Sequence, residues 1–136
     1  LNVKFTEDFV VWKKREIGGG LVGNFKSLAE ATDYLASQSL DVDQHDIIQT
    51  QSHLLMQKNA KTGVLGIPFI MDFASSKLRV SRSWTKGGDR FASLWKMKSV
   101  QTANKAGQKF MNLGVEFEGW STEEDYLEAK KLYESL

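Results

Sequence analysis

Side chains alternate between two faces, with the two-residue period of β-strands, over several stretches of this chain. This alternation predicts five strands, at about residues 9–16, 46–58, 64–73, 90–100 and 108–118. The short, glycine-containing connection "AKTG" predicts that the second and third strands form a hairpin. The turn "ANKAG" predicts that the last two strands form another hairpin. Pro68 places the third strand at a sheet edge or at a bulge.

A helical period replaces the alternation in other segments of the chain. Residues 27–38 are predicted to be helical because Ser27 can cap the first turn and Glu30 follows three residues later. The last segment is predicted to form a helix that begins with a capping box of Ser121 and Glu124. The apolar stripe expected to pack this C-terminal helix consists of Tyr126, Ala129, Tyr133 and Leu136.

Residues 75–85 fit either period. As a strand, the segment places Arg82 and Trp84 on one face; as a helix, it places Val80 and Trp84 one turn apart on an apolar face. The helical arrangement is favoured because it separates apolar from basic side chains, with the basic ones within about 60° of one another at 100° per residue. These basic residues are Arg79, Arg82 and Lys86.

The order of predicted elements is β, α, β-β, α, β-β, α. This order indicates a mainly β fold with peripheral helices, in which residues 1–136 form a single domain. Five strands joined mostly by hairpins fit a five-stranded antiparallel OB-like barrel with a C-terminal helix. A flat α+β sandwich is the structural alternative.

The composition limits the chemistry. The chain has no cysteine, which excludes disulfides, thiol catalysis and cysteine-ligated zinc. Hydrophobic residues make up 41% and charged residues 26%, as in an ordinary globular domain. No apolar run approaches the roughly 18 residues of a membrane span, and no signal peptide is recognised, so we expect no membrane partner. Residue 1 is Leu, and a segment preceding it is compatible with the sequence.

No motif indicates catalysis or a bound cofactor. His53 lies among apolar residues of a predicted strand and is expected to be structural. The stretch "GGGLVG" lacks the Gly-Lys-Ser/Thr ending of a phosphate loop and is expected to be a flexible connection. The turn that contains Asp41, Asp43 and Asp46 lacks the central glycine and closing glutamate of a calcium loop. We therefore expect a non-enzyme without a cofactor or a metal.

Positive charge and aromatic residues gather in "SSKLRVSRSWTKGGDRFASLWKMK", residues 75–98. This segment holds seven Lys or Arg and one acidic residue, a net charge of +6, while the rest of the chain carries −5. Single-stranded nucleic acid is bound by basic grooves for phosphates with aromatic platforms for bases. The candidate nucleic-acid-binding residues are Arg79, Arg82, Lys86, Arg90, Trp95, Lys96 and Lys98. The alternative is that the aromatic residues are core and the basic residues form a solvated face.

Three segments also resemble a group of phage-encoded proteins with OB-like barrels, some of which bind single-stranded DNA. They are "SSKLRVSRSW" (75–84), "FASLWKMKSVQTANKAG" (91–107) and "EEDYLEAKKLYESL" (123–136). The resemblance implies non-catalytic binding of single-stranded DNA, with RNA as another partner, in phage DNA replication or recombination in the cytoplasm of the infected cell. The competing hypothesis is a viral structural or assembly protein without nucleic-acid specificity. Homo-oligomerisation is compatible with both.

Overall fold

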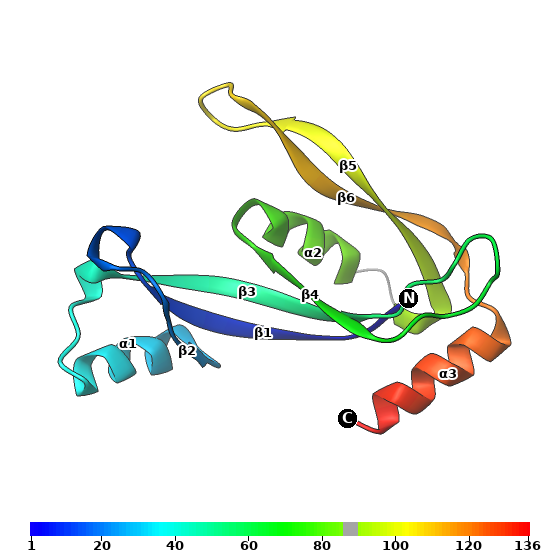
Figure 1. Cartoon of the computed structure of the whole chain (residues 1–136), viewed down its shortest axis with the longest axis horizontal. Helices are drawn as coiled ribbons and strands as arrows, with labels where there is room; N and C mark the ends of the chain where they lie inside the picture. Colours follow the sequence, from blue (N-terminus) through cyan, green and yellow to red (C-terminus); the bar gives the residue numbers. More distant parts are fainter. Residues whose placement is uncertain (86–89) are drawn as a thin grey trace.

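A long, strongly twisted antiparallel sheet forms the centre of the protein (Figure 1). The computed structural model describes residues 1–85 and 90–136. Within them, the sheet has the strand order β2-β1-β3-β4. Its strands are β1 (Asn2–Lys13), β2 (Leu21–Phe25), β3 (His45–Leu55) and β4 (Phe69–Ala74).

A separate two-stranded hairpin lies above this sheet and slants away from it toward its tip (Figure 1). It consists of β5 (Ser93–Ala103) and β6 (Lys109–Trp120), and it is called the arm below. The helices are α1 (Leu28–Ser37), α2 (Leu78–Thr85) and α3 (Glu123–Glu134). Short 3₁₀ turns are η1 (Arg15–Ile17), η2 (Val42–Gln44), η3 (Ser75–Lys77) and η4 (Arg90–Ala92).

The mainly β fold is confirmed, with three helices in the described residues, but α2 is not peripheral because it packs between the sheet and the arm. The five-stranded barrel is not confirmed, because the strands of the described residues form sheets of four and two strands and no closed barrel. The sheet does not close because the arm pairs only with itself there, and α2 lies between the arm and β3 (Figure 1).

Two boundary predictions at the N-terminal end were wrong. β1 begins at Asn2, seven residues before the expected start. The stretch "GGGLVG" is more than a connection, since its Leu21 opens β2, which pairs with β1. Gly18, Gly19 and Gly20 all have φ between 67° and 114°, a backbone conformation in which L side chains are strained. The glycines thus make the reversal that returns the chain to β1.

One face of the twisted sheet carries two hydrophobic clusters. At one end, Val11 packs against Ala31 and Leu35 of α1. At the other end, Phe73 packs against Trp84 of α2. In Figure 1 the two helices lie on opposite sides of the sheet ribbon, because the sheet twists along its length. The prediction that residues 75–85 favour a helix with a buried Trp84 is confirmed, and Trp84 is only 4% exposed.

The helix ends follow the predicted capping chemistry, with one shift. Ser27 Oγ accepts a hydrogen bond from the Glu30 amide at 3.1 Å, as expected for α1. In α3 the cap is Thr122, whose hydroxyl accepts from the Asp125 amide at 3.2 Å, instead of Ser121. Ser121 Oγ instead donates to the carbonyl of Phe91 at 2.8 Å. Ser121 therefore ties the chain before α3 to the turn before the arm.

The predicted stripe of α3 is only partly buried. Ala129 is fully buried in a cluster with Val3 and Met56, and Leu132 packs against it. The rings of Tyr126 and Tyr133 pack on Phe91, with centroids 5.1 and 5.9 Å away, although Tyr133 is otherwise exposed. Leu136 is exposed, so its assignment to the packed stripe was wrong.

Candidate interaction surface

The predicted basic segment is divided among several elements. Arg79 and Arg82 are exposed on α2, and Arg82 Nη2 donates to Gln49 Oε1 on β3 at 3.2 Å. Arg90 is the first residue of η4. Lys86 lies outside the described residues. The structure thus keeps Arg79 and Arg82 together and uses Arg82 to tie α2 to the sheet.

Trp95 lies on the face of the arm that turns toward the core. Its ring meets Trp84 at 6.3 Å and Phe117 at 5.9 Å between centroids, both edge to face. Met97, two residues along the same face, packs against the same cluster. A stacking role for Trp95 requires this face to be open, but the Trp95 ring is half-buried against protein.

Lys96 and Lys98 lie on the opposite face of the arm and are exposed. Lys98 Nζ donates to Glu116 Oε2 at 2.5 Å, and Glu116 lies directly across from Lys96 in the strand register. The hydrogen bond and the charge of Lys98 lower the pKa of Glu116 below its ordinary value of 4.5. A carboxylate of β6 therefore offsets part of the positive charge that the sequence gathers in β5.

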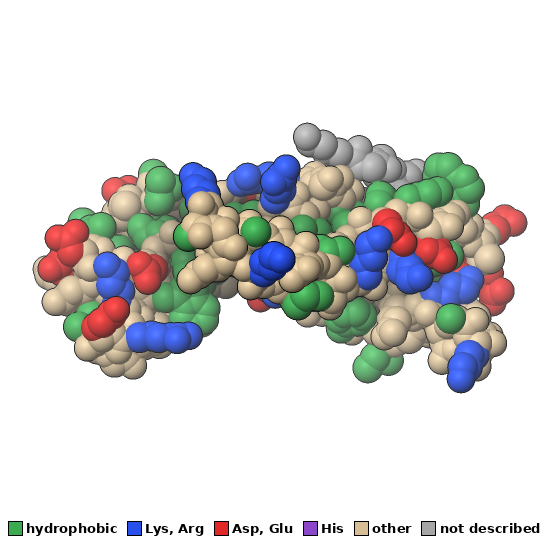
Figure 2. Space-filling view, turned by 90° about the horizontal axis from the view of Figure 1, so that it is seen from above, with side chains coloured by type: hydrophobic (Ala, Val, Ile, Leu, Met, Phe, Trp, Pro, Cys, Tyr) green, Lys and Arg blue, Asp and Glu red, His purple; other side chains and the backbone are tan. Residues whose placement is uncertain are grey.

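The overall charge segregation nevertheless persists in space. Residues 75–85 and 93–120, called the basic part below, carry seven basic and two acidic residues, a net charge of +5. The remaining described residues carry ten basic and fourteen acidic residues, a net charge of −4. Seen from above, basic side chains predominate among the charged ones in the middle of the molecule, and most of the acidic side chains in view lie toward its two ends (Figure 2).

The arm exposes large apolar side chains along its length. Phe110 and Met111 near the tip are 37% and 64% exposed, and Phe117 and Trp120 toward the base are 50% and 75% exposed. Phe110 lies on the outer face and Met111 on the inner face, beyond the part that packs on the core. Monomeric proteins rarely leave such a run of aromatic surface in water, so this surface is typical of a contact site.

Both edges of the arm also lack a partner strand among the described residues. β5 and β6 pair only with each other over 11 and 12 residues. A free edge presents unpaired backbone N–H and C=O groups that another strand can take up. The arm therefore offers two faces and two edges for contact.

A groove of about 660 Å³ separates the base of the arm from the sheet. Its apolar wall includes Leu55, Met56, Trp84, Trp95 and Met97, and its polar rim includes Lys58, Lys96 and Glu118. Phe69 of β4 also lines the groove and is 41% exposed. The apolar contact surface thus continues from the arm toward β4.

Ser81, His53 and Asn2 form a buried hydrogen-bonded row that resembles a catalytic triad in composition. Ser81 and His53 are fully buried, so neither reaches a substrate. Gln51 sets the direction of hydrogen-bond donation along the row, because its Nε2 donates to the carboxylate of Glu7 at 2.7 Å. Gln51 Oε1 then accepts from the Ser81 hydroxyl at 2.5 Å.

Ser81 Oγ in turn accepts from His53 Nε2 at 2.6 Å, and His53 Nδ1 accepts from Asn2 Nδ2 at 2.8 Å. Ser81 thus gives its proton to an amide and not to His53, which is the reverse of an activated nucleophile. The prediction that His53 is structural is confirmed. The imidazole stacks on Trp84, with ring centroids 4.9 Å apart, and the row fixes α2 on β3.

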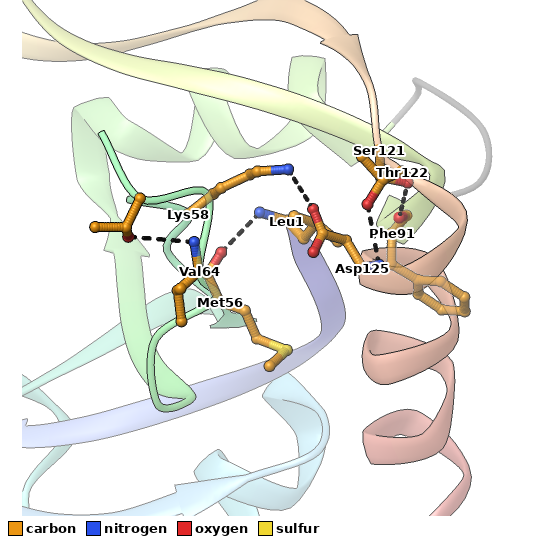
Figure 3. A network of polar contacts seen from close by, with 9 residues as sticks. Leu1, Met56, Lys58, Val64, Phe91, Ser121, Thr122 and Asp125 are labelled. Atoms are coloured by element: carbon orange, nitrogen blue, oxygen red, sulfur yellow. Dashed lines mark hydrogen bonds and ion pairs between the residues drawn. The ribbon is translucent and has the colours of Figure 1, made fainter. Parts of the chain in front are cut away.

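A second polar cluster anchors α3 (Figure 3). Lys58 Nζ lies 2.5 Å from a carboxylate oxygen of Asp125, which is buried. The Leu1 nitrogen donates to the carbonyl of Met56 at 2.8 Å beside this pair. These contacts join the start of β1, the β3–β4 connection and the first turn of α3.

The acidic turn before β3 is organised by its own backbone. Asp41 Oδ1 accepts from the Asp43 amide at 2.9 Å and so caps η2. Among residues 1–85 and 90–136, no cluster of three or more His, Asp or Glu side chains has the arrangement of a metal site. The turn therefore acts as a local capping structure.

Comparison with protein-family models gives a match over residues 1–136, the whole chain, to the family described as Pam3 phage gp34-like protein. The chain belongs to this phage family. The phage part of the sequence-based resemblance is thereby confirmed, while the family description names no activity or ligand. Comparisons with curated proteins and with solved structures give no match.

Within the described part of this gp34-like chain, no helix is long and apolar enough to cross a bilayer. The exposed apolar residues of the arm were not predicted from the sequence. The signal was present in "KFMNLGVEFEGW", where Phe110 and Trp120 occupy even positions together with Asn112, Glu116 and Glu118. Aromatic residues on the polar face of a strand mark a surface that is covered by something other than the chain's own core.

Proposed function

We propose that this gp34-like chain is a non-catalytic assembly protein of a phage, which binds another protein chain through the arm. The observation that supports the proposal most strongly is the arm itself. It is a two-stranded hairpin with four exposed large apolar side chains and unpaired edges in the described residues. A two-stranded hairpin is marginally stable in water unless something packs on it.

The chain's own core covers only part of the arm. Trp95, Met97, Leu113 and Val115 pack against α2, whereas Phe110 and Met111 lie beyond that contact. A protein partner that covers the outer half would bury apolar area and satisfy the strand edges at the same time. Assembly of a particle from separate chains brings such a protein partner into contact with the arm.

The buried position of the reactive side chains supports a non-catalytic role. The Ser81 hydroxyl and the His53 imidazole form hydrogen bonds that hold α2 against β3. The exposed apolar side chains and strand edges of the arm are suited to contact with another protein surface. Assembly of phage particles takes place inside the infected cell, so we propose that the chain acts in the cytoplasm of the host.

Composition of the particle tests the assembly role. Phage particles and assembly intermediates are separated on a density gradient and analysed by quantitative mass spectrometry. The assembly role predicts that this chain is found in a fixed copy number relative to other particle proteins, in the particle or in one intermediate. Its absence from every such fraction would contradict the proposal.

A second candidate function is binding of single-stranded DNA in phage replication or recombination. The observation that favours it is the net charge of +5 on the basic part, with Lys77, Arg79 and Arg82 and no acidic residue on η3 and α2. Affinity for a fluorescent oligonucleotide would fall with salt, with a slope of about −0.7 per phosphate contact. Replacing Arg79 and Arg82 with Ala should flatten that slope, and an unchanged slope would remove these residues from the site.

A further inference from the structure

We propose that the arm's partner is a second copy of this chain, and that the arm's tip binds the outer face of α3 in that copy. This inference rests on the proposed assembly function and specifies its partner. Its starting point is the charge distribution, since the basic part carries +5 and the remaining described residues carry −4. A second copy therefore offers a surface of opposite sign to each arm.

The tip of the arm is a rigid basic and apolar structure. Asn104 Oδ1 accepts from the backbone amides of Ala106 and Gln108 at 3.0 and 2.9 Å, which holds the turn in one conformation. Lys105 and Lys109 are exposed and form no ion pair within residues 1–85 and 90–136. The exposed side chains of Phe110 and Met111 follow directly, so both cations flank an apolar centre.

The outer face of α3 has the complementary arrangement. Glu124, Leu127 and Glu128 are exposed and lie on one stripe of the helix, which continues to the exposed Lys131, opposite Ala129, which is buried. Leu127 supplies an apolar centre between two carboxylates. The ion pair of Asp125 with Lys58 holds the first turn of the helix in place, so this face is presented in a fixed orientation.

The contact is between two copies because the tip cannot reach its own α3. Figure 1 shows the tip at the top and α3 at the lower right, with α2 and the sheet between them. Each copy can use its tip and its α3 at once, because they are different surfaces; made reciprocally between two copies, the contact closes a two-fold dimer, and made head to tail it is heterologous. Repetition of such a contact produces a ring or a filament, as an assembly protein requires.

Charge reversal tests the pairing. The first variant carries Lys105→Glu and Lys109→Glu, the second carries Glu124→Lys and Glu128→Lys, and the third carries all four changes. Lys61→Glu, an exposed lysine on the β3–β4 connection, is the control. Sedimentation velocity at low salt measures self-association, with thermal melting of each variant to verify the fold.

We expect the natural chain and the control to self-associate, and the association to weaken with added salt. The first and second variants alone should bind themselves at least about tenfold more weakly, because like charges then face each other. An equimolar mixture of the two, and the third variant alone, should recover association. Recovery is the decisive result, since damage to the fold cannot produce it.

The pairing of the tip with α3 would be overturned if the first and second variants lose association and neither their mixture nor the third variant recovers it. A natural chain that stays monomeric at all concentrations would overturn a second copy as the partner. The assembly role itself would then still be judged by the composition of the particle, because a different phage protein can occupy the arm.

Discussion

Replacing Ser81 with Ala should destabilise the protein strongly although it removes a single oxygen atom. The Ser81 hydroxyl accepts from His53 Nε2 and donates to Gln51 Oε1, and all three side chains are buried. The substitution leaves one donor and one acceptor without a partner in the core. Each buried polar group left unsatisfied costs about 1–3 kcal/mol. Ala is a better helix former than Ser by roughly 0.5 kcal/mol, which offsets a small part.

The expected loss is therefore about 2–5 kcal/mol in the free energy of unfolding, a large part of the roughly 5–15 kcal/mol that a domain possesses. Urea unfolding followed by far-ultraviolet circular dichroism measures it. Ser83→Ala is the matched control, because Ser83 is exposed on the same helix and its loss should change stability by at most about 0.5 kcal/mol. If Ser81→Ala unfolds at the same urea concentration as Ser83→Ala, the buried row contributes no stability and the reasoning is refuted.

Four further substitutions test the core, the arm and α3. Trp84→Ala should cost about 3–5 kcal/mol of stability, whereas Trp120→Ala, at an exposed position of the arm, should leave the melting temperature nearly unchanged. A nuclear magnetic resonance titration should give Glu116 a pKa below 4.5, and this pKa should rise in Lys98→Ala. The small contribution of this exposed pair to the free energy of unfolding is present at neutral pH and is lost as pH falls through the pKa of Glu116 in the folded state. Asp125→Asn should lower the free energy of unfolding by about 1–3 kcal/mol, because Lys58 then faces a neutral group; an unchanged urea midpoint would show that the pair does not anchor α3.

The local elements were predictable from the sequence, because short-range patterns determine them. Ser27 and Glu30 cap α1 as their spacing indicates, and Val80 and Trp84 define the buried side of α2. β2 was not predicted, since five residues after three glycines carry too little alternation to distinguish a strand from a loop. Its existence depends on pairing with β1, a contact that the sequence does not encode locally.

The arrangement of the arm was not predictable for a related reason. Its two strands were correctly paired, but alternation alone does not reveal whether a hairpin joins a larger sheet or stands apart from it. The placement of Trp95 also followed from tertiary contacts, because Trp84 and Phe117 meet its ring from other elements. The position of Met111 beyond the packed surface depends on where α2 ends, which the strand pattern does not contain.

Infection with a phage that carries Phe110→Ser and Met111→Ser in this chain tests the assembly role most directly. Both side chains are exposed, so the folded chain should keep its melting temperature, which is measured on the purified variant. We predict that phage genome copies, counted by quantitative amplification of DNA, stay at the natural level while the yield of complete particles falls. A fall in genome copies before any loss of particles would place the chain in DNA replication, and an unchanged yield of particles would show that the arm's apolar tip is not a contact site.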